Sequence, residues 1–145
     1  MPRSAIFLLL VLPQVFAAPV PKELKQTDEL RIRGTWEVVR YSCYGQDQVL
    51  TKPAQWQLDA DGKGTLINAN GPSPLEYKLL SADSPDAAKA IDYRWMEFKF
   101  KGLYKLDGDQ LTIAVNNDGG KIRAAELAPG KDVWYWEFRR VVSEK

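Results

Sequence analysis

Two pairs of acidic residues are the side chains best suited to do chemistry, Asp59 with Asp61 and Asp107 with Asp109. Two carboxyl groups can act as general acid and general base when burial makes one of them harder to ionise than the other. Both pairs adjoin a glycine in a predicted hairpin turn, where aspartate is favoured by turn geometry and stays in contact with water. In "DADGKGTLINAN" the twelfth position, where a calcium loop carries a bidentate glutamate, is Asn70. We therefore predict turns here, with no catalytic residue and no bound metal.

The rest of the composition also argues against an enzyme. The chain has no histidine and a single cysteine, Cys43. Without histidine, Ser-His and Cys-His nucleophile pairs, histidine bases and His-ligated zinc or copper sites are excluded. Arg40, three residues before Cys43, would point to the other face of a strand, so no neighbouring cation activates the thiol. We expect Cys43 to be buried and unreactive, and we expect no cofactor.

The charged residues give no reason to expect a nucleic acid or an anionic membrane as partner. The formal net charge is +1, and loss of an N-terminal segment containing Arg3 would make the chain formally neutral. Lys99, Lys101 and Lys105 alternate with apolar residues. The simplest interpretation is the solvated face of an edge-exposed strand pair, and the alternative is a specific anion site.

Aromatic side chains are the remaining candidates for a site, and they allow two interpretations. The chain holds five Trp and six Tyr. Rings that face inward could line a pocket for a small apolar or amphipathic molecule, and our candidates are Trp56, Tyr77, Phe98 and Trp134. Equally, the interior of an eight-stranded barrel is just wide enough to be filled by its own side chains. A pocket predicts ligand binding, whereas a filled core predicts a cell-envelope interaction or scaffold domain with an unknown protein partner.

The elements that must position these rings are β-strands. Apolar and polar residues alternate with period two, interrupted by turn sequences such as "DADGKG" and "NGPSP". The strongest hairpin signal is Asp107-Gly108, because this pair accepts the positive φ of a tight turn. About eight strands follow one another in this way, which predicts an antiparallel meander that closes to hide its edges.

The N-terminus predicts export. Residues 1–17, "MPRSAIFLLLVLPQVFA", combine one cation, a short apolar run and small residues, as a secretory signal peptide does. The apolar run is too short to span a bilayer, so we expect no integral membrane segment after cleavage. Residues 18–28 read as a flexible leader and residues 29–145 as one domain. The expected location is periplasmic or extracellular.

Gly34-Thr35-Trp36, at the start of the predicted first strand, resembles the Gly-x-Trp signature of the lipocalin superfamily. In that superfamily the Trp closes the barrel floor, and an Arg late in the last strand packs across its ring. The resemblance implies that Gly34, Trp36 and Arg140 close the barrel, with Arg139 as the alternative if the register shifts by one residue. A guanidinium over an indole gains a cation-π contact and can donate to carbonyls of the leading segment.

The chain as a whole resembles a family of conserved hypothetical exported domains, expanded in planctomycete bacteria and described as lipocalin-like. The matching segments occur in order and span almost the whole mature chain: "LRIRGTWEVV", "KAID", "GLYKLDGDQLTIAV" and the ending "WYWEFRRVV". The resemblance implies export and an all-β, antiparallel up-and-down barrel of about eight strands, with no established activity or ligand. This chain departs from the usual pattern in its last strand, where two Trp and a Tyr replace commoner aliphatic residues.

Overall fold

The computed structural model describes residues 27–80 and 88–142. The predicted signal peptide (1–17) and nearly all of the predicted leader (18–28) lie outside these residues, so neither prediction is tested. The described chain begins with one helical turn, α1 (Asp28–Arg31), which starts at the last residue of the predicted leader. Among the helices of the described residues, none has the length and apolar character that crossing a membrane requires.

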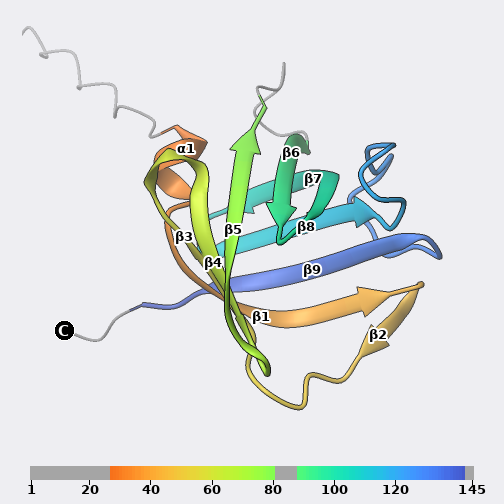
Figure 1. Cartoon of the computed structure of the whole chain (residues 1–145), viewed down its shortest axis with the longest axis horizontal. Coiled ribbons are helices and arrows are strands. Elements are labelled where there is room, and N and C mark those ends of the chain that lie inside the picture. The colour runs from red at the N-terminus through yellow and green to blue at the C-terminus, as the bar shows by residue number, and fades with distance from the viewer. Residues whose placement is uncertain (1–26, 81–87, 143–145) are drawn as a thin grey trace, which may run out of the picture.

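The described residues form one antiparallel sheet whose strands are hydrogen-bonded almost in sequence order, and pairing of the first strand with the last closes it. The strands are β1 (Gly34–Cys43), β2 (Gln46–Gln48), β3 (Gln55–Leu58), β4 (Lys63–Asn68), β5 (Gly71–Leu79), β6 (Lys89–Trp95), β7 (Phe98–Asp107), β8 (Gln110–Asn116) and β9 (Val133–Arg140). The closed wall is an eight-stranded antiparallel barrel, which confirms the predicted all-β lipocalin-like architecture. In Figure 1, β7, β8, β9 and β1 lie side by side across the view, and β3 to β5 run nearly upright.

β1 is shared between three neighbours. Its first half pairs with β3, for example Gly34 with Leu58, and its second half pairs with β2, for example Tyr41 with Gln48. Along its other edge it pairs with β9. β2 therefore extends the wall beyond β3 as a short flap and is not needed to close the barrel.

The two ends of the barrel differ. We call the end that holds α1, the β3–β4 turn with its short 3-10 helix η1 (Ala60–Gly62), and the β7–β8 turn the closed end. We call the opposite end, at the β4–β5 and β6–β7 turns, the mouth. The predicted Asp107-Gly108 hairpin is present, because Asp107 pairs with Gln110 and Gly108 has φ of 56°.

A β-bulge in β1 changes which of its residues face inward. Val38 pairs with Phe138, but the next pair is Arg40 with Glu137, so Val39 has no partner. Beyond the bulge Tyr41 lies opposite Trp136 on the inner face, and Arg40 points outward. The extra residue thus brings a tyrosine into the barrel at a position that unbroken alternation from Trp36 would leave outside.

Lys99, Lys101 and Lys105 lie on the outer, solvated face of β7, as the alternation predicts. Lys99 and Lys101 lie on the first part of β7, which pairs only with β6, and Lys105 lies on its last part, which pairs only with β8. The connection between β8 and β9 also crosses the outer surface nearby. Its Ala124 is buried against the outward-facing Ala114 and Tyr135.

Candidate functional site

The closed end is built around Trp36, which is fully buried. Its Nε1 donates a hydrogen bond to the carbonyl of Ile32 at 2.7 Å. The Cζ atom of Arg140 lies 4.2 Å from the centroid of the Trp36 ring, and the guanidinium donates to the carbonyls of Arg33, at 2.7 Å, and Arg31. Gly34 has φ of 123°, and a Cβ atom there would lie 3.0 Å from Nη1 of Arg140. Gly34, Trp36 and Arg140 therefore meet at the closed end, as the sequence predicts.

The register of β9 decides between the two candidate arginines. Arg140 lies opposite Trp36 and Arg139 lies opposite Glu37 on the outer face. The side chain of Arg139 is 68% exposed and forms an ion pair with Glu37 at 3.6 Å. Arg140 is therefore the residue that covers the tryptophan.

A partly buried carboxylate holds α1 against the barrel. Oδ2 of Asp28 accepts hydrogen bonds from Nζ of Lys89 at 2.8 Å and from Oη of Tyr104 at 2.9 Å. Burial opposes ionisation of Asp28, but these two hydrogen bonds and the charges of Lys89 and Arg31 outweigh it and hold the pKa of the carboxyl below its usual value. Burial and the bond to Asp28 raise the pKa of the Tyr104 hydroxyl. This cluster joins α1 to β6 and β7 and is structural.

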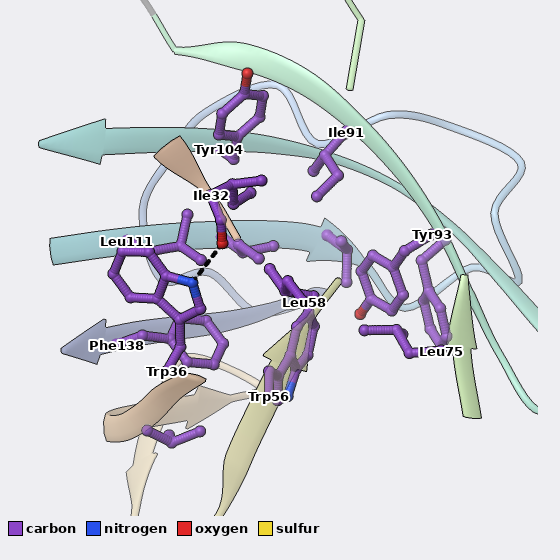
Figure 2. Close-up of a cluster of buried hydrophobic side chains, with 14 residues drawn as sticks. Ile32, Trp36, Trp56, Leu58, Leu75, Ile91, Tyr93, Tyr104, Leu111 and Phe138 are labelled. Carbon is purple, nitrogen blue, oxygen red and sulfur yellow. Dashed lines mark hydrogen bonds between the residues drawn. The ribbon is translucent and has the colours of Figure 1, made fainter. Parts of the chain in front are cut away.

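Aromatic rings pack across the middle of the barrel. Trp56 is 3% exposed and lies 5.3 Å from Tyr93, 5.7 Å from Trp136 and 5.0 Å from Phe138, measured between ring centroids. Figure 2 shows Trp56 and Tyr93 lying beside Leu58 and Leu75 among the buried side chains. From Tyr93 the contacts continue through Phe100, so the barrel interior is packed at this level.

Toward the mouth the rings become partly exposed. Trp134 lies 5.6 Å from Phe100 and 6.1 Å from Trp136, and Tyr41 stacks on Trp136 at 5.5 Å. Nε1 of Trp134 is buried and has no hydrogen-bond partner in the described part of the chain. By contrast, Nε1 of Trp95, also at the mouth, donates to Oγ of Ser73 at 2.8 Å. The mouth therefore presents half-buried ring faces and one unused N–H donor.

Tyr41 and Cys43 lie side by side on the mouth half of β1. Burial first, and then a hydrogen bond with Cys43, raise the pKa of the Tyr41 hydroxyl. Cys43 is a free thiol of intermediate exposure, so the prediction that it is buried is wrong, because it lies where β1 reaches the rim opposite Trp134.

The four residues predicted to line a pocket do not form one site. Trp56 and Trp134 belong to the same connected set of rings, at its floor and at its rim. Phe98 is 51% exposed at the end of β7. Tyr77 points toward the closed end, where its Oη donates to the carbonyl of Asp59 at 2.7 Å and burial raises its pKa. The structure thus separates Tyr77 from the mouth and leaves Phe98 on the rim.

Tyr41 and Trp136 are residues of the mouth that were not among the predicted ligand-binding set. Trp136 carries a signal in the sequence, because it alternates with Trp134 and Phe138 along the last strand. Tyr41 carries no such signal, because the bulge at Val39 turns its side chain to the face opposite the one that alternation predicts.

Two surface hollows lie away from the mouth. One of about 560 Å³ lies over the outer face of β5, β6 and β7 and is lined mostly by charged side chains. The other, of about 350 Å³, lies at the closed end between α1 and β5, next to Arg33 and Tyr77.

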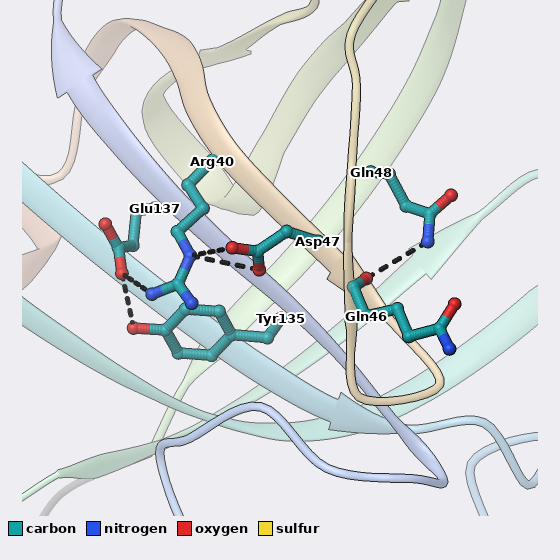
Figure 3. A network of polar contacts seen from close by, with 6 residues as sticks. All are labelled: Arg40, Gln46, Asp47, Gln48, Tyr135 and Glu137. Atoms are coloured by element: carbon teal, nitrogen blue, oxygen red, sulfur yellow. Dashed lines mark hydrogen bonds and ion pairs between the residues drawn. The ribbon is translucent and has the colours of Figure 1, made fainter.

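The outer face of β1, β2 and β9 carries a polar network (Figure 3). Arg40 bonds Asp47 through Nε at 3.1 Å and Glu137 through Nη1 at 3.0 Å, and its Cζ lies 5.6 Å from the centroid of the Tyr135 ring. Burial first, and then a hydrogen bond to Glu137, raise the pKa of Tyr135 to about 12. These contacts tie the β2 flap to the wall.

The two pairs of aspartates lie on the surface of the barrel. Asp59, Asp61, Asp107 and Asp109 are all exposed in turns. The residues that the structure describes contain no group of three or more His, Cys, Asp or Glu side chains that could hold a metal ion. Neither of these two aspartate pairs is therefore buried in the way that acid–base catalysis requires.

Comparisons with known proteins leave the site to be interpreted from its own geometry. No family model matches the chain, and neither the curated proteins nor the solved structures give a match.

Proposed function

We propose that this protein is an exported, non-enzymatic binding protein of the lipocalin-like kind, which takes a small amphipathic molecule at the mouth of its barrel. The observation that carries the proposal is the buried Nε1–H of Trp134, which has no acceptor in the described part of the chain. A buried donor without a partner costs about 1–3 kcal/mol, so an acceptor atom supplied by a ligand would recover this free energy.

The neighbouring rings define what such a ligand must look like. Tyr41 and Trp136 are stacked with an interplanar angle of 17°, and both are partly exposed at the mouth. Flat aromatic faces favour a planar or apolar ligand, and the single donor favours one carbonyl or hydroxyl oxygen on it. A quinone, a pigment or a lipid with a carbonyl group has this combination.

The packed middle limits how deep the ligand goes. Trp56 is almost fully buried by Tyr93, Trp136 and Phe138, so it forms a floor beneath the mouth. The proposed site therefore comprises Trp134, Trp136 and Tyr41 with Phe98 at the rim, and Tyr77 has no part in it.

Membership of the lipocalin-like exported family is part of the same proposal. Its support is the Gly34-x-Trp36 motif together with the position of Arg140 over the Trp36 ring. Secretion experiments with the full chain, comparing it with a chain that lacks residues 1–17, test the export component.

The binding component is tested by displacement of a fluorescent hydrophobic dye by quinones, carotenoid pigments and fatty acids. Trp134→Phe keeps an aromatic ring and removes the N–H, so it should weaken binding of a carbonyl ligand about five- to tenfold. Trp95→Phe is the matched control, because the N–H that it removes is bonded to Ser73 inside the protein. Absence of saturable displacement by every ligand class, or equal losses in the two variants, would contradict the proposal.

A second candidate function is a cell-envelope interaction or scaffold domain. The packed middle of the barrel favours it, and so does Val49 in the β2–β3 connection, which is 90% exposed. A photo-crosslinking residue at position 49 should then yield one defined adduct in an exported fraction. The same residue at position 122, where Ile122 is 67% exposed on a different loop, is the control.

A further inference from the structure

The outward-facing side chains of β5, β6 and β7 form a positively charged hollow of about 560 Å³ on the barrel wall. Its cations are Lys63, Lys78, Arg94, Lys99 and Lys101, and its acids are Asp61, Glu76 and Asp92. This volume lies within the range of about 300–1,000 Å³ that small-molecule sites occupy. The hollow is on the outside of the wall and shares no aromatic residue with the proposed site at the mouth.

Strand register arranges the cations in two rows across the hollow. Arg94 lies directly opposite Lys99, and in the neighbouring row Lys101 lies opposite Asp92, which in turn lies opposite Lys78. The rows are two residues apart along each strand, which corresponds to about 7 Å. A ligand in the hollow would therefore meet positive charge at two places separated by about this distance.

Two of the three acids of the hollow, Asp92 and Glu76, are already engaged by arginines. Oδ1 of Asp92 lies 2.6 Å from Nη2 of Arg123, and Arg123 also donates through Nη1 to the carbonyls of Ile91 at 3.1 Å and Gly102 at 2.8 Å. Glu76 lies 3.5 Å from Nε of Arg94. These contacts neutralise the two carboxylates that lie nearest to the lysines.

Three lysines of the hollow have no ion-pair partner among the described residues. Across the part of the chain that the structure describes, Lys78, Lys99 and Lys101 take part in none of the ion pairs. Arg94 and Lys99 are like charges directly opposite each other on paired strands, an arrangement that destabilises a sheet. An anion seated between the rows would turn this repulsion into attraction.

We propose that this hollow is a binding site for a small anion with two or more linked phosphate groups. A phosphate group carries up to two charges and three acceptor oxygens, so a short chain of phosphates satisfies both rows of cations, whereas one carboxylate satisfies a single row. Lysine suits such a ligand, because its ammonium is a compact point charge with three donors.

The test is calorimetric titration of the full-length protein with tripolyphosphate at low salt. The wild type should bind one equivalent, and the double variant Lys99→Gln with Lys101→Gln should bind about tenfold more weakly. Lys105→Gln is the matched control, since Lys105 is an exposed lysine on the same face of β7 that does not line the hollow. Its affinity should stay within about twofold of the wild type.

A gain of affinity separates the proposal from loss through misfolding. Glu76→Gln removes a negative charge from the hollow and frees Arg94, so tripolyphosphate should bind about threefold more tightly. The proposal is overturned if the wild type shows no saturable binding or binds several equivalents. It is also overturned if Lys105→Gln loses as much affinity as the double variant, which would indicate general charge attraction.

Discussion

Arg140 covers the ring of Trp36, with Cζ 4.2 Å from the ring centroid, and the same guanidinium donates to carbonyls of the segment that leads into β1. One side chain of β9 thus contacts both the start of β1 and the segment that joins α1 to β1. It lies against the residue that plugs the barrel and bonds the backbone that crosses beneath it.

Trp36→Ala should lower the free energy of unfolding by about 3–5 kcal/mol, because it removes a fully buried large aromatic side chain and leaves a cavity. Urea unfolding followed by circular dichroism measures the change. An unchanged denaturant midpoint would mean that Trp36 does not plug the barrel.

Arg140→Lys should cost about 1–3 kcal/mol, because an ammonium cannot stack on Trp36 and bond the carbonyls of Arg31 and Arg33 at once. Arg139→Lys is the control, since Arg139 is exposed and makes one surface ion pair. Equal effects of the two substitutions on the urea midpoint would contradict the role given to Arg140.

Asp28 should make stability depend on pH in the acid range. Its pKa is lower in the folded protein than the value of about 3.9 for an unfolded chain, so its contribution is complete above that value. The contribution is lost as the pH falls through the folded pKa, where the carboxylate takes up a proton. Urea midpoints of the wild type and Asp28→Asn should therefore differ at neutral pH and converge as the pH falls through the lowered pKa of Asp28. Asp61→Asn, at an exposed turn, should follow the wild type.

Deletion of Val39 should leave the barrel able to form, because it removes the one residue of β1 at the bulge that has no partner on β9. Without Val39, Val38 still faces Phe138 and Arg40 still faces Glu137, so the two strands keep their register and Tyr41 keeps its inward side. Substitution Val39→Thr keeps the chain length and should leave the barrel intact, since Val39 is 51% exposed. Near-ultraviolet circular dichroism of the aromatic side chains checks both variants, and loss of the native spectrum on deletion of Val39 would contradict the role given to the bulge.

The barrel and its closed end could be predicted from the sequence, because both depend on local patterns. Alternation identified the strands, and the resemblance of the Gly34-Trp36 motif to the lipocalin signature identified a late arginine as the partner of Trp36, which Arg140 is. The choice between Arg139 and Arg140 needed the register, which follows from the inward positions of Trp136 and Phe138.

The mouth and the outer hollow could not be predicted in the same way. The bulge at Val39 leaves no mark in the alternation of β1, so Tyr41 was assigned to no site. Lys99 and Lys101 alternate like any exposed lysines, and only the pairing of β6 with β7 sets Lys99 beside Arg94. Arg123 lies in an irregular connection, and its bond to Asp92 depends on how that connection crosses the sheet.

The pairing of β1 with β9 also has a consequence for the order in which the molecule folds. Every other strand of the wall pairs with one that is close to it in the sequence. The pairing of β1 with β9 instead joins residues that are far apart in the sequence, such as Trp36 and Arg140. During synthesis β1 cannot form this pairing until β9, the last of these strands in the sequence, has been made. The barrel therefore closes only after β9 has been synthesised. Such long-range closure slows folding, and we expect the newly made chain to keep an open, unpaired β1 edge until β9 has been made.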